Sequence, residues 1–182
     1  PTNGALRNYF AYPAEWCFKL PDNVSTMEGT MLEPLSVGMH AAGRGGAELG
    51  KTALIIGVGT IGYMTMLACK AMGVSKIIVS DALENRLALA LQHGADYAIN
   101  VKNEDGIAHL KAMSPVDCIF LDPARRNEHG GKTVAISDCE PNVAELEALL
   151  LSKANRVMIK LSPMLDLSLA LKELKHTQEI HI

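Results

Sequence analysis

The stretch KTALIIGVGTIGYMTMLACKAMGVSKIIVSD, residues 51–81, decides the fold. A short apolar run at 53–56 leads into a glycine-rich turn at 57–62, and a helix-patterned segment and a second apolar run follow and end on Asp81. This order predicts a βαβ unit that binds a dinucleotide, since such a unit consists of a strand, a glycine turn, a helix, a second strand and an acid.

Each glycine of the turn has a mechanical reason. Gly57 permits the sharp turn off the strand, Gly59 lets the backbone approach a pyrophosphate, and Gly62 lets the helix pack closely on the strand. The N–H groups of Thr60, Ile61 and Gly62 open the helix and would face the anion. We therefore predict that residues 57–62 bind the cofactor.

Asp81 ends the second strand, where a carboxylate can accept hydrogen bonds from both ribose hydroxyls. The same carboxylate would repel a 2′-phosphate, so the sequence favours NAD over NADP. The alternative interpretation is an α/β core that binds no nucleotide and uses its glycines only for packing.

The bulk properties exclude several classes of function. A chain of 182 residues can bury one substantial core, and its dispersed net charge of −3 suggests no nucleic-acid surface. No apolar run approaches the ~18 residues of a membrane span. The four cysteines are far apart and have no zinc-ligand spacing, so we predict no metal site and a reduced, cytoplasmic environment. The start, PTNGALRNYF, lacks an initiator methionine and a signal-peptide pattern, and we interpret it as a cut inside a longer gene.

Apolar runs and helical periodicity alternate along the rest of the chain. We predict strands at 52–57, 76–81, 97–100, 116–121, 156–161 and 178–182, and helices near 61–73, 83–93, 105–113, 141–153 and 165–174. Ser25 and Glu28 make a capping box for an irregular helical region that runs to about Gly43. This alternation predicts a doubly wound, mostly parallel, Rossmann-like α/β sheet with strand order 3-2-1-4-5-6.

Residues 1 to about 105 resemble the medium-chain, zinc-dependent polyol (sorbitol or xylitol) dehydrogenases. The resemblance rests on GALRNYFAYPAEWCFKLPDNVS (4–25), EPLSVGMHA (33–41), the glycine turn and LALALQHGADYAIN (87–100). It implies that the glycine loop and Asp81 bind NAD and that Arg86 lies beside the adenosine ribose. It also implies that Glu33 matches the glutamate near the catalytic zinc and its bound water, although a helix N-terminal carboxylate is the simpler interpretation of Glu33.

The sequence departs from this family in one severe respect. The family's zinc ligands, a cysteine and a His-Glu pair, lie upstream of the residues present here, as does most of its GroES-like substrate domain. Without zinc, hydride transfer has no Lewis acid to polarise the alcohol oxygen. The resemblance therefore implies an NAD(H)-binding oxidoreductase fragment that is inactive alone.

Residues from about 115 to 182 resemble bacterial class I S-adenosylmethionine-dependent methyltransferases with a THUMP-like, RNA-associated domain. This second resemblance rests on DCIFLDPARRNEHGGKTVAISDCEPNV (117–143) and RVMIKLSPMLDLSLALKEL (156–174). It implies that Asp122 lies beside the methyl donor and the group being methylated. The alternative is that Asp122 only ends a strand, and Lys160 is either a site residue or a lysine that extends outward into solvent.

The two resemblances together predict a chimera joined between residues 105 and 115. Residues 1–45 would be a remnant of the substrate domain with a linking helix, 46–105 the first half of an NAD-binding Rossmann domain, and 106–182 a methyltransferase-like second half. The expected function is NAD(H) binding by a part of a zinc-dependent alcohol or polyol dehydrogenase. A methyltransferase-like protein and an inert hybrid are the alternatives, and a homo-oligomer is left open.

One residue argues against the methyltransferase alternative. Such enzymes usually carry an acid two positions before the first glycine, where it holds the donor's methionine amine, and this chain has Ile55 there. The donor would lose a charge-assisted hydrogen bond worth about 1.5 to 3 kcal/mol.

Overall fold

The computed structural model describes residues 7–125, 135–162 and 165–181. The chain divides into two compact units, Pro1–Glu33 and Pro34–Ile182. Among the described residues, no helix combines the length and the apolar character that crossing a membrane requires.

The first unit contains little regular structure. It holds a 3-10 turn, η1 (Ala14–Trp16), and a single helical turn, α1 (Thr26–Gly29). The predicted capping box is confirmed: the Ser25 hydroxyl accepts a hydrogen bond from the Glu28 N–H at 3.2 Å, and a Glu28 carboxylate oxygen accepts one from the Ser25 N–H at 2.8 Å. The Ser25 hydroxyl also donates to that carboxylate at 2.7 Å, and this hydrogen bond, followed by the one from the Ser25 N–H, lowers the pKa of Glu28. The helical region then breaks after α1, and α2 begins at Leu32 and ends at Gly45.

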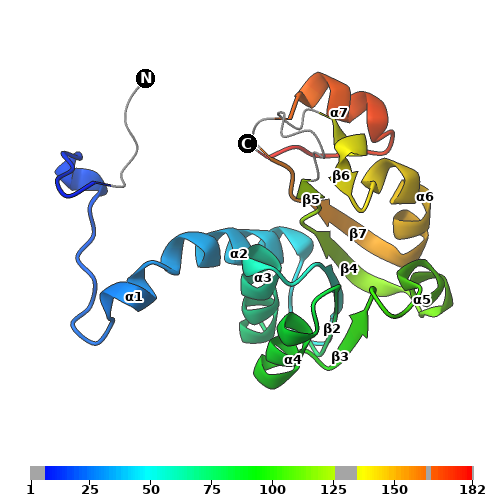
Figure 1. The fold of residues 1–182 in the computed structure, drawn as a ribbon, viewed down its shortest axis with the longest axis horizontal. Helices are drawn as coiled ribbons and strands as arrows, with labels where there is room; N and C mark the ends of the chain where they lie inside the picture. Colours follow the sequence, from blue (N-terminus) through cyan, green and yellow to red (C-terminus); the bar gives the residue numbers. More distant parts are fainter. Residues whose placement is uncertain (1–6, 126–134, 163–164, 182) are drawn as a thin grey trace. The chain divides into compact units, whose positions relative to one another are not determined.

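The second unit is the predicted parallel sheet with helices on both faces (Figure 1). Its strands are β1 (Thr52–Ile56), β2 (Lys76–Asp81), β3 (Tyr97–Asn100), β4 (Val116–Leu121) and β7 (Ala154–Ile159), in the order β3-β2-β1-β4-β7. Its further helices are α3 (Thr60–Ala71), α4 (Glu84–His93), α5 (Gly106–Ala112), α6 (Val143–Lys153) and α7 (Leu167–Glu173). The doubly wound α/β class and the first five places of the predicted strand order are confirmed.

The predicted strand at 178–182 is wrong, and one strand pair was not predicted. Residues 178–181 form no strand, and residue 182 lies outside the described residues. This segment is largely polar and exposed, and Glu179 forms a 2.9 Å ion pair with Arg44 of α2 instead of extending the sheet. The structure also contains a short antiparallel pair, β5 (Ala124–Arg125) and β6 (Cys139–Glu140), with a 3-10 turn, η2 (Ile136–Asp138), before β6. Two-residue strands carry no readable alternation, so the sequence pattern missed them.

The core lies on both faces of the central strand. Leu54 and Ile55 of β1 are neighbours in sequence and point to opposite faces, so each contributes to a different apolar cluster. The cluster on the Ile55 side includes Met66 of α3 and Leu87 of α4, whereas the cluster on the Leu54 side includes Leu150 of α6. A sheet covered on both faces by helices explains why its strands are almost continuously apolar.

The predicted join between residues 105 and 115 falls on α5 and the turn before β4. Across this point the sheet is continuous, because β4 pairs in parallel with β1 from Ala53–Cys118 to Ile56–Leu121. A side-chain contact joins the two strands where their pairing begins. Asp117 Oδ2 accepts hydrogen bonds from the Thr52 N–H at 2.8 Å and from the Thr52 hydroxyl at 2.9 Å. Lys51 lies 3.5 Å from the other oxygen of the same carboxylate.

We predict that Asp117→Asn destabilises the fold at neutral pH and that the effect becomes smaller in acid. The backbone and hydroxyl hydrogen bonds from Thr52, with help from Lys51, hold the pKa of Asp117 below its ordinary value. A carboxylate whose pKa is lower in the folded state stabilises the fold above its unfolded pKa, and this contribution is lost as pH falls through the folded pKa. Urea unfolding followed by circular dichroism at pH 7 and pH 3 measures the difference between wild type and variant.

Glu48→Gln is the matched control for this prediction, because it removes the more exposed carboxylate that lies 3.7 Å from Lys51. It should change little at either pH. A loss of stability in Asp117→Asn that is equal at pH 7 and pH 3 would show that the charge of Asp117 is not the cause.

Candidate functional site

Four residues form a row along the carboxyl edge of the sheet. Ile56 pairs with Ser80 on one side and with Leu121 on the other, and Leu121 pairs with Ile159. The next residue on each of these four strands therefore lies at the same level: Asp81, Gly57, Asp122 and Lys160. The chain runs from β1 outward through β2 and β3, and then returns to place β4 on the other side of β1. A sheet of this kind binds its ligands in the crevice at that change of direction.

The glycine turn has the geometry that the sequence predicts. Gly57 has φ +89°, in the left-handed region that favours glycine, and its N–H donates to the Ser80 carbonyl at 2.8 Å. A Cβ on Gly62 would overlap the carbonyl oxygen of Gly57, so the start of α3 packs directly on the turn. A Cβ on Gly59 would meet Arg86 at an ordinary 3.7 Å. The structure thus requires glycine at positions 57 and 62, and the role of Gly59 toward a pyrophosphate stays a prediction.

The first turn of α3 offers uncapped backbone donors. Gly59 is the N-cap residue and provides no side-chain hydrogen bond to the helix. The N–H groups of Thr60, Ile61 and Gly62 precede the first intrahelical hydrogen bond, which the Tyr63 N–H makes to the Gly59 carbonyl at 2.9 Å. Thr60 is exposed. An anion at this end of α3 would meet N–H groups and the positive end of the helix dipole.

Asp81 ties the second strand to the glycine turn. Its side chain is 7% exposed, and its two oxygens accept hydrogen bonds from the backbone N–H groups of Val58 and Leu83, both at 2.9 Å. The guanidinium of Arg86, which is half-exposed, lies 3.6 Å from Asp81 Oδ2. The sequence predicts a ribose partner at this position but misses the contact with Val58, because only the fold brings the turn above the end of β2. The ribose role stays a prediction, and the lone pairs that the two N–H groups leave could serve it.

Asp122 and Lys160 form an ion pair at the ends of β4 and β7. Lys160 Nζ lies 3.2 Å from Asp122 Oδ1, and the two side chains are 38% and 30% exposed. The backbone N–H of Lys160 donates to the Leu121 carbonyl at 2.8 Å, which fixes the lysine beside the end of β4. The lysine thus turns toward its neighbour in the row. The sequence predicts Lys160 inside a strand at 156–161, whereas β7 ends at Ile159, one residue before it.

The residues described do not fit a catalytic zinc. Glu33 lies in the first turn of α2, as the simpler interpretation of this residue expects. Across residues 7–125, 135–162 and 165–181, no three His, Cys, Asp or Glu side chains gather in a group that could hold a metal ion. No chemical step through zinc can be assigned to these residues.

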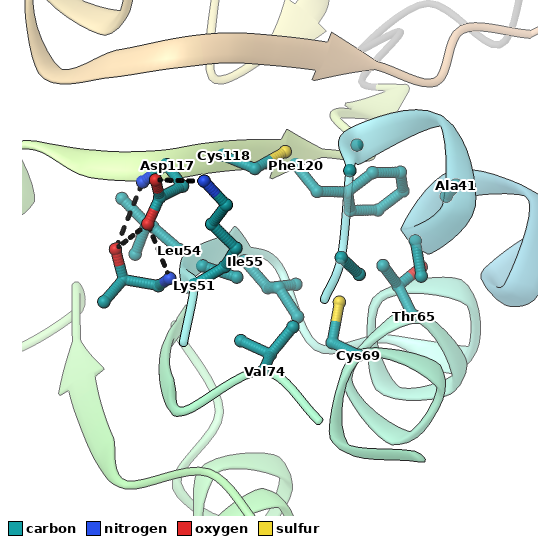
Figure 2. Close-up of a pocket in the computed structure, with 16 residues that line it drawn as sticks. Ala41, Lys51, Leu54, Ile55, Thr65, Cys69, Val74, Asp117, Cys118 and Phe120 are labelled. Atoms are coloured by element: carbon teal, nitrogen blue, oxygen red, sulfur yellow. Dashed lines mark hydrogen bonds and ion pairs between the residues drawn. The ribbon is translucent and has the colours of Figure 1, made fainter. Parts of the chain in front are cut away.

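A separate pocket lies between α2, α3 and the sheet, away from the row (Figure 2). Cys69 of α3 and Cys118 of β4 line it together with Phe120, and the ion pair of Lys51 and Asp117 lies at one end. Burial raises the pKa of Cys69 to about 11 and, with a contribution from Cys69, that of Cys118 to about 12. Both thiols are therefore protonated at neutral pH and are poor nucleophiles, which excludes thiolate chemistry in this pocket.

Comparison with known proteins supports the dehydrogenase resemblance. A family described as zinc-binding dehydrogenase matches residues 60–124. The chain is 50% identical over 111 residues to the uncharacterised zinc-type alcohol dehydrogenase-like protein YdjJ of Escherichia coli, covering 61% of this chain and 32% of that protein. It is 44% identical over 131 residues to the sorbitol dehydrogenase of Bos taurus, covering 67% of this chain and 37% of that enzyme. The chain thus spans about a third of the length of these relatives.

A solved structure extends the likeness to the fold. A short chain alcohol dehydrogenase from Escherichia coli, complexed with NADH, has a TM-score of 0.62 and 25% identity and covers 84% of this chain and 42% of that one. These likenesses show neither a methyltransferase part nor a join. Over its dehydrogenase segment, the chain is similar to the zinc-dependent alcohol and polyol dehydrogenases.

Proposed function

We propose that this chain binds NAD(H) at the carboxyl edge of its sheet, as the nucleotide-binding part of a polyol dehydrogenase. The observation that carries the proposal is the tight glycine turn, which leads into an uncapped helix N-terminus beside the buried carboxylate of Asp81. The NADH complex of the structural neighbour supports the same choice of ligand.

The residues of the turn fit the chemistry of the cofactor. The N–H groups of residues 60–62 would bind the pyrophosphate, and Gly59 would let it approach the backbone. The carboxylate of Asp81 would accept hydrogen bonds from the adenosine ribose, with Arg86 beside it. When bound, the cofactor supplies the hydride acceptor or donor of a dehydrogenase. The protein's own part here is to bind and orient the dinucleotide.

The finer assignments rest on this proposal. We assign residues 46–105 to the adenosine half of the site and residues 106–182 to the second half of the sheet, after a linking region at 1–45. A polyol substrate follows from the relatives' names alone. We expect NAD to be preferred over NADP, because a 2′-phosphate would approach the Asp81 carboxylate.

Isothermal titration of the chain with NADH and NADPH tests the proposal. NADH should bind with a 1:1 stoichiometry, and NADPH should bind at least about tenfold more weakly, a difference of about 1.4 kcal/mol. AMP provides a comparison ligand that lacks the pyrophosphate. A chain that unfolds cooperatively but takes up neither dinucleotide would contradict the proposal. Non-cooperative unfolding would instead favour the inert hybrid.

The methyltransferase alternative has one observation against it. Ile55, which stands where a methyl-donor site usually carries an acid, is fully buried and belongs to the core cluster that includes Met66. It therefore has neither the charge nor the access to hold a methionine amine. Competition between NADH and S-adenosylhomocysteine, followed by NADH fluorescence, distinguishes NAD(H) binding from methyl-donor binding. Preferential binding of S-adenosylhomocysteine would favour the methyltransferase.

A further inference from the structure

We infer that Asp122 and Lys160 form a second half-site in the same crevice, which takes the ribose diol of the second nucleoside of a dinucleotide. The inference rests on the proposed function and deepens it. It assigns binding residues on the β4–β7 side of the crevice, opposite Asp81 and Arg86.

The position of the pair follows from the register of the sheet. Gly57, Asp122 and Lys160 are the first residues after three adjacent strands. A Cβ on Gly57 would lie 3.8 Å from the carbonyl oxygen of Asp122, so the two strand ends lie directly side by side. Neighbouring strands are about 4.8 Å apart, which places Lys160 roughly 10 Å from Gly57 across the sheet. A ligand held at the glycine turn can extend over this distance.

The two carboxylates of the row differ in their availability. Asp81 is 7% exposed, and each of its oxygens already accepts a backbone N–H. Asp122 is 30% exposed, and Lys160 contacts its Oδ1. Within the described residues, Asp122 Oδ2 accepts no hydrogen bond. A vicinal diol supplies the O–H donors that such an oxygen binds well, because a charged acceptor makes the stronger hydrogen bond.

Lys160 makes this carboxylate compatible with a dinucleotide. A lone carboxylate in the crevice would repel the pyrophosphate that the first turn of α3 attracts. The ammonium group at 3.2 Å offsets that charge and holds the carboxylate in one orientation. The alternative is that the pair only links β4 to β7, but a pair this exposed contributes little to stability, and the backbone hydrogen bonds of the two strands already join them.

Three ligands and two variants test the half-site. ADP lacks the second ribose, ADP-ribose contains it, and NADH adds the nicotinamide. Asp122→Asn should weaken ADP-ribose and NADH about tenfold, the effect of one charge-assisted hydrogen bond, and should not weaken ADP. Lys160→Met leaves the Asp122 carboxylate without its ammonium partner, so it should weaken all three ligands. Lys172→Met, which changes an exposed lysine of α7, is the matched control. Thermal unfolding should give all three variants the wild-type midpoint within ~2 °C.

The outcomes separate the half-site from the proposed function. If the wild type binds ADP and ADP-ribose alike, and Asp122→Asn binds both as the wild type does, the half-site is overturned while nucleotide binding stands. If Asp122→Asn weakens ADP as much as ADP-ribose, the pair acts on the shared diphosphate and not on the second ribose, which also overturns the assignment. If the wild type binds none of the three ligands, the proposed function fails and the half-site fails with it.

Discussion

Gly62→Ala is expected to lower the free energy of unfolding by about 3 kcal/mol and to abolish detectable NADH binding. The added methyl group would overlap the carbonyl oxygen of Gly57 and come within 3.4 Å of a methyl group of Ile55. The oxygen belongs to the backbone, so no change of rotamer can relieve the overlap. Overpacking of a well-filled site costs about 1–3 kcal/mol and occasionally more. The turn would have to move, and the donors that follow it would move with it.

Urea unfolding and titration with NADH measure the two effects. Gly43→Ala is the matched control, because a Cβ at this α2 position meets nothing within 4 Å. It should stabilise the protein by about 0.4–1 kcal/mol, since alanine reduces the freedom of the unfolded chain. If Gly62→Ala keeps wild-type stability and affinity, the helix does not pack on the turn as closely as the structure indicates.

The sequence predicts the sheet well because its strands are apolar runs with clear ends. The bounds of β2, β3 and β4 agree with the predicted 76–81, 97–100 and 116–121. These strands are buried between helices, so their sequence departs sharply from that of the polar turns around them. The glycine turn was equally predictable, since the geometry at positions 57 and 62 tolerates no other residue without strain.

The sequence could not show which residues meet across the sheet. The contact between Asp81 and the Val58 N–H joins residues from different elements, and the pairing of Asp122 with Lys160 depends on the register between β4 and β7. The false strand at 178–182 has a related cause. Whether a short segment at the edge of a sheet pairs with the neighbouring strand depends on its surroundings. Here Glu179 forms an ion pair with Arg44 instead. The local pattern of apolar and polar residues does not indicate such contacts between residues far apart in the sequence.

Asp81→Ala is expected to cost about 2–5 kcal/mol of stability and to weaken NADH by at least about a hundredfold. The substitution removes the acceptor of two backbone N–H groups, those of Val58 and Leu83, next to a buried strand end. The Val58 contact is buried and the Leu83 contact is part-buried, and a buried donor left without a partner costs about 1–3 kcal/mol. Loss of the Val58 contact also frees the glycine turn, so the pyrophosphate donors lose their fixed position together with the ribose acceptor.

Asp81→Asn separates the structural role from the choice of cofactor. Its amide oxygen can still accept one of the two N–H groups, so it should destabilise the fold by about half as much as alanine does. It removes the negative charge completely, and the ratio of NADPH to NADH affinity should therefore rise about tenfold or more, with Arg86 left to meet the 2′-phosphate. Glu84→Gln, at the exposed start of α4, removes a nearby carboxylate as a control and should leave that ratio unchanged. Equal losses of stability in the alanine and asparagine variants, with an unaltered cofactor ratio, would mean that the charge of Asp81 selects nothing and that this carboxylate only supports the turn.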